Sequence, residues 1–428
     1  MSVPSSGNPY GGVPGGGVSL PPYFRPTDSV RNTTTFFPGT EALGTDEMRV
    51  TFMGSIPWPP RRGQAGTCIM VELGNGKRLF FDFGSGCLRN IIAQQVPMVE
   101  INDIFLTHLH VDHYADIPYL FCFAPFAGRW TPLRVTGPSG RLPEFGTRAM
   151  IEGMKQMTRW HWNAFSMAPV GDGYEVEVNE FDWREDNGIC YQQDGVTVRH
   201  WRRIHGMDGS SAYRLDWNGL SFVWTGDGRA DEKTIEYASG ADVFVTECLT
   251  DTPSILAAKI RVPEMRTRTM IDNAHTPHYA VGYMMKQINP RVGAICHFVW
   301  DPDLLGETIA GIREHWKGLF QFGLDGTVLN VTRDAVWSRT TVFPDYAHGA
   351  PPDLDRMFGG NIPEDLVLPQ PTRERFKEQE QATRDGEVAP SKYYPPDVAR
   401  EKAPYSSMAG EVRVNTREFY GQPDGKRR

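Results

Sequence analysis

The chain has 428 residues, 40% of them apolar, which suits one large domain with appendages or two domains. Its 44 Lys and Arg stand against 52 Asp and Glu, and this net charge of −8 argues against a surface built for a phosphate backbone. No apolar run reaches the ~18 residues of a membrane span, and the N-terminus lacks a secretory pattern. With six dispersed cysteines as buried free thiols, we expect a cytoplasmic protein.

The chain divides into three parts. Residues 1–46 form a Gly- and Pro-rich arm that cannot build a core alone. Residues 47–340 alternate strand-like and helix-like segments and carry all the candidate site residues, with an insertion at 133–195. Residues 341–428 form an extension rich in Pro and charge. We expect the two arms either to wrap a neighbouring subunit, making a homo- or hetero-oligomer, or to be disordered.

The first strands of the central part end in polar side chains. An apolar run over residues 79–81 leads into Asp82 and a glycine-rich turn, and a second run over 104–106 leads into a cluster of ligand-type residues. Two of its histidines alternate with a leucine, so both leave the same side of an extended chain. An aspartate and a third histidine follow in a turn. The cluster can therefore hold two metal ions, and its members are His108, His110, Asp112 and His113.

Three later strand-like runs also end in ligand-type residues. The alternating segment 196–205 ends with His205, the run 220–224 precedes Asp227, and the run 292–295 precedes His297. His200 is a rival to His205. We prefer His205 because His200 alternates in phase with valines of its own strand, which is typical of a packed strand histidine.

The pattern His108-x-His110-x-Asp112-His113, followed by His205, Asp227 and His297, resembles the metallo-β-lactamase superfamily over roughly residues 48–335. The resemblance implies a four-layer αββα sandwich of the α/β class and a metal-dependent hydrolase. It implies one ion on His108, His110 and His205, and a second on Asp112, His113 and His297. Asp227 would bridge them, and Asp82 would orient a ligand histidine. The N and O ligands suit two Zn²⁺, although Mn²⁺ or Fe would also fit.

Further features resemble the tRNase Z and arylsulfatase-like branch, namely residues 52–57 and a histidine before the helix-like stretch 280–287. This likeness implies His275 as the proton donor, with His278 as a competitor, and Glu247 as the residue that orients it. Asp112 would orient the nucleophile. The tRNA-processing members carry His-Glu-Ala-Thr, whereas this chain has Thr246 before Glu247. We interpret this departure as an incomplete proton relay that argues against RNA processing.

The aromatic residues indicate an apolar substrate pocket, to which we assign Trp162 in the insertion and Trp300 after the last ligand. The insertion is acidic over 175–186, and the basic patch 199–203 is too small to reverse this charge. We therefore predict a dinuclear zinc hydrolase in which a metal-bridging hydroxide attacks a small organic substrate. The substrate class includes aromatic molecules, and we expect no nucleic-acid partner. The bond could be an ester, phosphoester, sulfate ester or activated aryl ether. The alternatives are a tRNA 3′-end endonuclease-like phosphodiesterase and a non-catalytic, metal-stabilised assembly subunit.

Overall fold

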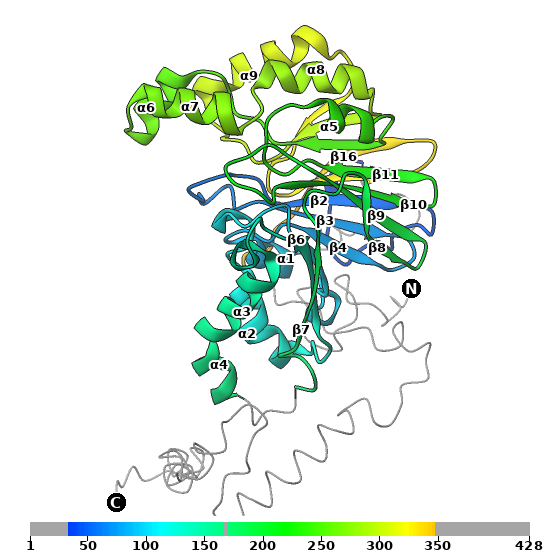
Figure 1. The fold of residues 1–428 in the computed structure, drawn as a ribbon. Helices are drawn as coiled ribbons and strands as arrows, with labels where there is room; N and C mark the ends of the chain where they lie inside the picture. The colour runs from blue at the N-terminus through cyan, green and yellow to red at the C-terminus, as the bar shows by residue number, and fades with distance from the viewer. Residues whose placement is uncertain (1–32, 166–169, 347–428) are drawn as a thin grey trace, which may run out of the picture. The chain divides into compact units, whose positions relative to one another are not determined.

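The computed structural model describes residues 33–165 and 170–346 (Figure 1). The described residues fall into two compact units, one with residues 33–156 and 173–346 and the other with residues 157–165 and 170–172. All the metal-ligand candidates belong to the first unit. The predicted arms span residues 1–46 and 341–428. Of these, residues 33–46 and 341–346 are described, and Thr35–Phe36 form β1, a strand of the first sheet. The predictions for the rest of the arms lie outside the described residues.

The described strands of the first unit form two sheets. The first sheet has nine strands in the order β1-β16-β15-β2-β3-β4-β5-β6-β7, and the second has seven in the order β14-β13-β12-β11-β10-β9-β8. The strands of the first sheet are β1 (Thr35–Phe36), β16 (Val336–Thr341), β15 (Thr327–Val331), β2 (Met48–Gly54), β3 (Cys68–Leu73), β4 (Arg78–Phe81), β5 (Asp103–Phe105), β6 (Leu133–Pro138) and β7 (Val176–Phe181). Those of the second are β14 (Phe320–Phe322), β13 (Val292–Ile295), β12 (Val243–Thr246), β11 (Leu220–Trp224), β10 (Ser211–Trp217), β9 (Val196–Arg202) and β8 (Gly188–Gln193).

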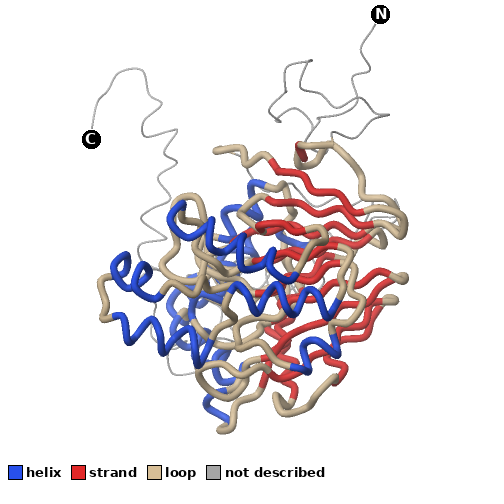
Figure 2. The backbone as a smooth tube through the Cα atoms, turned by 90° about the horizontal axis from the view of Figure 1, so that it is seen from above, coloured by secondary structure: helices blue, strands red, loops and turns tan. Residues whose placement is uncertain are grey.

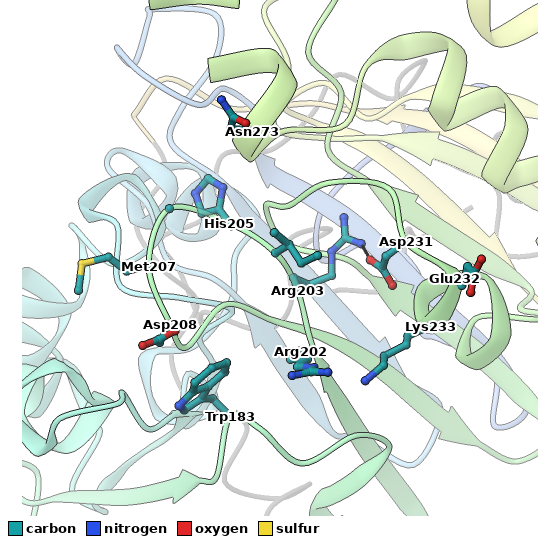
Figure 3. A pocket seen from close by; sticks show the side chains of 12 residues that line it. Trp183, Arg202, Arg203, His205, Met207, Asp208, Asp231, Glu232, Lys233 and Asn273 are labelled. Carbon is teal, nitrogen blue, oxygen red and sulfur yellow. Dashed lines mark hydrogen bonds and ion pairs between the residues drawn. The ribbon is translucent and has the colours of Figure 1, made fainter. Parts of the chain in front are cut away.

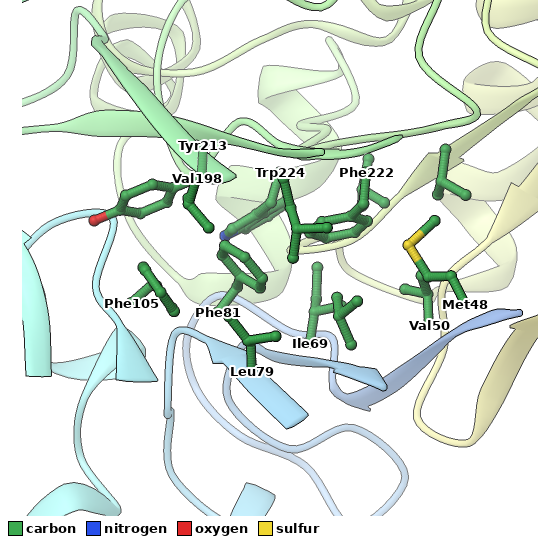
Figure 4. Packing of buried hydrophobic residues seen from close by; sticks show 14 of the residues in the cluster. Met48, Val50, Ile69, Leu79, Phe81, Phe105, Val198, Tyr213, Phe222 and Trp224 are labelled. Carbon is green, nitrogen blue, oxygen red and sulfur yellow. The ribbon is translucent and has the colours of Figure 1, made fainter. Parts of the chain in front are cut away.

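The main core lies between the two sheets (Figure 4). Strands such as β2, β3 and β11 are buried at every position, because each is covered on both faces. At the centre, the ring of Phe81 in the first sheet lies 5.1 Å from that of Phe222 in the second, centroid to centroid. Phe81 also stacks on Phe105, again at 5.1 Å. This aromatic core fixes the spacing of the strands whose ends carry the site.

Helices cover the outer face of each sheet, which completes the four layers (Figures 1 and 2). A second core of apolar side chains joins β11, β12 and β13 to the helices α5 (Glu232–Tyr237), α8 (His278–Ile288) and α9 (Pro302–His315). On the other sheet lie α1 (Cys87–Ala93), α2 (Ile117–Phe123) and α3 (Thr147–Met157). The predicted αββα sandwich is therefore confirmed.

Residues 133–195 extend both sheets of this unit. They supply β6 and β7, which run parallel beside β5, and then β8, which pairs with β9 of the other sheet. Helix α3 lies between β6 and β7 in sequence. The following helix α4 (Arg159–Ala164), which carries Trp162, belongs to the second compact unit.

Helix α6 (Pro253–Ile260) and helix α7 (Glu264–Ala274) form a hairpin between β12 and α8, with a small apolar cluster of their own. No helix in the described part of the chain is both long enough and apolar enough to cross a bilayer. All six cysteines are buried and free, as expected.

Candidate metal centre

The candidate ligands lie in loops at one edge of the two sheets. Strands β4 and β5 are parallel, and so are β11, β12 and β13, so their carboxyl ends meet at the same side of each sheet. The loops that follow these ends carry Asp82, the His108–His113 cluster, Asp227, Glu247 and His297. This edge is where open α/β sheets commonly place a site, because the connections there are free to vary.

The first ligand group consists of His108, His110, His205 and Asp227, each with one ligand atom within 4.8 Å of the others. His110 Nδ1 lies 2.9 Å from His108 Nε2 and 3.1 Å from His205 Nε2. Asp227 Oδ2 lies 3.8 Å from His108 Nε2 and 3.7 Å from His205 Nε2. Ligands placed 2.0–2.1 Å from one tetrahedral ion would be about 3.4 Å apart, so these four atoms surround a space of the right size.

The second ligand group consists of Asp112, His113 and His297. Asp112 Oδ2 lies 3.3 Å from His297 Nε2 and 3.6 Å from His113 Nε2. Asp227 again borders the group, with 3.5 Å between Oδ1 and His113 Nε2 and 3.2 Å between Oδ2 and His297 Nε2. The Asp227 carboxylate therefore stands between the two groups, as a bridging ligand must.

Asp82 fixes the position of the ligand cluster through hydrogen bonds on the side away from the ligand space. It is fully buried, and its carboxylate accepts hydrogen bonds from the Thr107 N–H at 2.8 Å and the Trp224 indole N–H at 2.8 Å. Its Oδ2 lies 2.9 Å from His113 Nδ1, which leaves Nε2 of that ring directed at the ligand space. A carboxylate on the far nitrogen fixes both the tautomer and the orientation of a metal-binding histidine.

Close backbone approach holds the cluster together. A Cβ on Gly84 would lie 2.1 Å from the Asp112 carbonyl oxygen, so only glycine fits beside this ligand. Asp82 and His297 themselves have positive φ angles of 59° and 54°. Backbone of this kind is uncommon for such residues and is found more often at functional sites, where the surrounding structure over-determines it.

The loop of His297 is clamped by the β2–β3 connection. The Gln64 side chain donates to the Phe298 carbonyl at 3.0 Å and accepts from the Trp300 N–H at 3.1 Å. The Phe298 N–H donates to the Ser55 carbonyl at 3.0 Å. The Ser55 hydroxyl in turn donates to the partly buried carboxylate of Asp325 at 2.7 Å. These contacts account for the unusual backbone at His297.

Glu247 pairs with His275, which approaches the cluster from the end of α7. The carboxylate is fully buried and lies 2.7 Å from His275 Nδ1, while its other oxygen accepts from the Gly228 N–H at 2.5 Å. His275 forms a third possible ligand group with Asp227 and His297. The interpretation that Thr246 breaks a His–Glu relay is wrong in physical terms, because the histidine that meets Glu247 comes from position 275.

The pKa shifts of several ligands suit metal binding. At His113 burial lowers the pKa, but the Asp227, Asp82 and Asp112 carboxylates raise it well above its ordinary value, so a metal bound there would displace a proton. Burial and neighbouring histidines lower the pKa of His108 well below its ordinary value, and burial also lowers the pKa of His205. Burial opposes ionisation of Asp112, but His113 and His297 hold the pKa of this carboxyl at about 2. Neutral imidazoles and ionised carboxylates are the forms that bind metal. At His275, burial opposes charge but the Glu247 carboxylate raises the pKa to about 9, so this ring keeps its proton.

Two buried ligand atoms have no hydrogen-bond partner within the described residues, His113 Nε2 and Asp227 Oδ1. They face each other at 3.5 Å. Unpaired buried polar atoms are rare because each costs the free energy of its lost hydration. Atoms that ligate a cation would be satisfied by it, so the residues fit the metal pair implied by the resemblance.

The structure separates the rival histidines from the cluster. His200 is buried with its ring 3.7 Å from that of Phe181, and neither ring nitrogen has a hydrogen-bond partner in the described structure. His278 begins α8 and accepts from the Asp251 N–H at 3.1 Å. Neither residue belongs to a ligand group.

The two tryptophans chosen as pocket residues differ in what the structure says of them. Trp300 is 39% exposed, and its ring packs edge-on against Phe322, with 5.3 Å between centroids. It does not line either pocket beside His205. Trp162 lies in α4 of the other compact unit, so its assignment to the pocket stays a prediction.

Two pockets open beside His205 and share the loop of residues 205–208. One of about 640 Å³ is lined by Trp183, Arg202 and Lys233, among others (Figure 3). The other, of about 290 Å³, reaches His108 and His110 and is bordered by the 142–146 loop. Sequence reasoning predicted the three histidines and noted the basic patch, but it missed other pocket residues, among them Glu144, Phe145 and Met207. These three come from irregular loops, whose positions no periodic pattern reports.

The basic residues of the patch 199–203 lie in different environments, some buried and some at the surface. Arg203 is buried and forms an ion pair with Asp231, and Arg202 lies 3.9 Å from Asp186 on the surface. Lys233 also pairs with Asp186. The cations of the larger pocket are therefore largely neutralised by neighbouring acids.

Comparison with known proteins agrees with this geometry. The family described as tRNase Z endonuclease matches residues 60–116, which include Asp82 and the His108–His113 cluster. Ribonuclease Z of Methanosarcina acetivorans is 32% identical over 141 residues, which cover 31% of this chain and 44% of that protein. Ribonuclease Z of Picrophilus torridus is 23% identical over 230 residues, covering 47% of this chain and 74% of that protein. The chain spans less than half the length of the first curated relatives that it matches.

Among solved structures, the metallo-β-lactamase fold protein YhfI from Bacillus subtilis aligns with a TM-score of 0.51 at 19% identity. The alignment covers 67% of this chain and 100% of that one, and it supports the shared fold. The ribonuclease relatives overturn the expectation of a small-molecule substrate without a nucleic-acid partner. That expectation relied on the net charge of the whole chain, on the acidic stretch 175–186, on the aromatic residues and on Thr246. The charges are those of the surface rather than of the ligand cluster, and the absence of a histidine at position 246 does not leave Glu247 without a histidine partner.

Proposed function

The chain belongs to the metallo-β-lactamase superfamily, and from this premise we propose that it is a metal-dependent phosphodiesterase that cleaves RNA, with the 3′ end of precursor tRNA as its substrate class. The observation that carries the proposal is the Glu247–His275 pair, which stands beside a complete set of seven His and Asp ligands. The names of the ribonuclease Z relatives supply the substrate class.

We assign two zinc ions to the two ligand groups, with Asp227 between them. Ions bound in such a pair supply a nucleophilic water at neutral pH and neutralise charge on the scissile group. The protein's part is to hold the ligand atoms in place through Asp82, Gln64 and the Ala274 carbonyl, which is 2.7 Å from His205 Nδ1. Asp112 has a pKa of about 2, and as a carboxylate it would accept a hydrogen bond from the nucleophilic water and orient it.

His275 donates the proton to the leaving oxygen. Glu247 holds Nδ1 at 2.7 Å, so the Nε2–H is the one available to substrate. A phosphodiester leaving group is a ribose oxygen, which must gain a proton as the bond to phosphorus breaks. The buried carboxylate keeps the imidazole charged and correctly turned for this transfer.

The test is cleavage of a precursor tRNA transcript with a 3′ trailer, with zinc or manganese and with a chelator. We expect metal-dependent release of the trailer, and a loss of about 10²–10⁴-fold for His275→Ala, since that is the usual contribution of a general acid. His278→Ala is the matched control and should leave the rate near that of the wild type. A metal-loaded protein that leaves the transcript intact would contradict the proposed function.

A further inference from the structure

The smaller pocket beside the metal centre differs in chemistry from the larger one. It has a volume of about 290 Å³, and one wall is formed by His108, His110 and His205. The remaining walls are largely apolar and include Tyr114, Phe145, Met150 and Met207. At about 300 Å³ it stands at the small end of ligand pockets, which suits a single ring system rather than a long chain.

The charged groups of this pocket are acidic. Glu144 and Asp208 line it, and no lysine or arginine does. Asp208 is 3.4 Å from Arg141, whose side chain is 75% exposed, whereas Glu144 forms no ion pair with any of the described residues. A phosphate placed here would meet two carboxylates and no cation. A neutral ring that carries hydrogen-bond donors could instead donate to these carboxylates and pack against the apolar walls.

We propose that this pocket receives the nucleobase next to the scissile phosphate, and that Glu144 reads the amino group on the edge of that base. The inference rests on the proposed RNA substrate and adds its base preference. Phe145, which is 44% exposed on the 142–146 loop, offers a ring on which a base can stack. Carboxylates accept hydrogen bonds from the N4 amino group of cytosine, whereas uracil presents a carbonyl oxygen at the same place.

The pocket can be tested with RNA substrates that the wild-type, metal-loaded protein cleaves. One is intact, and two others carry a single abasic nucleotide on one or the other side of the scissile bond. We expect Phe145→Ala to lower kcat/KM about tenfold on the intact RNA, which is the order of one base–aromatic stacking contact. On one of the abasic substrates the same variant should differ little from the wild type. Phe126→Ala is the matched control, since Phe126 is also 44% exposed but does not line the pocket.

The base preference gives a second readout. Two RNAs are compared that carry either cytosine or uracil at the position identified by the abasic substrates. The wild-type protein should cleave the cytosine RNA about fivefold faster than the uracil RNA, as expected for one amino–carboxylate contact. Glu144→Gln replaces one acceptor with an amide that can donate to uracil, so the preference should narrow or reverse.

Equal losses for Phe145→Ala on intact and abasic RNA, or an unchanged preference in Glu144→Gln, would overturn the base pocket while leaving RNA cleavage in place. If no RNA is cut although bis(p-nitrophenyl) phosphate is hydrolysed, the proposed RNA substrate fails, and the base pocket fails with it.

Discussion

Glu247 illustrates how a residue's role depends on its partner in space. From the sequence, the threonine before it indicated a missing histidine. In the fold, the buried carboxylate accepts a hydrogen bond from the Gly228 N–H and pairs with His275, which is 28 positions later. That the seven candidate ligands come together could be predicted, because they follow strand ends in a recognisable order. The pairing of Glu247 with His275 was implied by the resemblance alone. It could not be derived from the residues themselves, because it depends on where the α6–α7 hairpin returns the chain.

This pair predicts a pH dependence. The pKa of His275 is raised to about 9, above its ordinary value of 6.5, so the proton is present at neutral pH and is lost as the pH rises through the raised value. The rate of RNA cleavage should therefore fall on the alkaline side. In Glu247→Gln the carboxylate is gone, the pKa of His275 falls, and the alkaline limb of kcat/KM should move to lower pH. A limb that does not move in this variant would exclude His275 as the titrating donor.

Asp82 should control metal affinity without touching a metal. Its carboxylate fixes His113 at 2.9 Å, and losing such a partner typically costs about 10–100-fold in metal affinity. We expect this loss in Asp82→Asn, measured by competition with a chelating dye. The control is Asp103→Asn at the opposite end of β5, where the carboxylate pairs with Arg134. Equal affinities for both variants would show that Asp82 does not orient the ligand.

Among the elements, the regular ones were predicted better than the loops. The helix expected over 280–287 lies within α8, because its apolar residues recur at helical spacing. The loops that line the pockets have no period, so Phe145 and Met207 gave no signal. The basic patch 199–203 spans the end of β9 and the loop beyond it, and alternation along that strand buries some of its members and exposes others.

The clamp between the β2–β3 connection and the His297 loop yields a prediction about an element. Gln64→Leu keeps the size of the side chain but leaves the Phe298 carbonyl and the Trp300 N–H without their partner. Each unsatisfied buried group costs about 1–3 kcal/mol, so the loop should relax and release the strained backbone at His297. We expect weaker binding of one of the two metal equivalents in a zinc titration. Gln94→Leu, another buried glutamine, which contacts Thr341, should leave that titration unchanged.

At the scale of the whole molecule, net charge proved a poor guide to substrate. A total of −8 describes all 428 residues, whereas catalysis depends on a few groups at one edge of two sheets. The fold itself was predictable, because buried strands and a conspicuous ligand cluster indicate a layered α/β architecture. Substrate choice was not, because it depends on loops.

Metal should also stabilise the whole domain, since its ligands come from both sheets. A ligand that binds only the native state adds about 2.7 kcal/mol to the free energy of unfolding at a concentration 100 times its Kd. Removing zinc with a chelator should therefore lower Tm, and adding it back should restore the original value. Asp227→Ala should show a much smaller response to zinc. An identical Tm with and without metal would contradict the assignment of the ligands.

The most direct measurement is the zinc content per chain, by elemental analysis, of the wild type and of Asp227→Ala after equilibration with zinc. The account predicts about two equivalents for the wild type, as in two-metal hydrolases, and a clear reduction when the bridging carboxylate is lost. Undiminished zinc in Asp227→Ala, or none in the wild type, would contradict it.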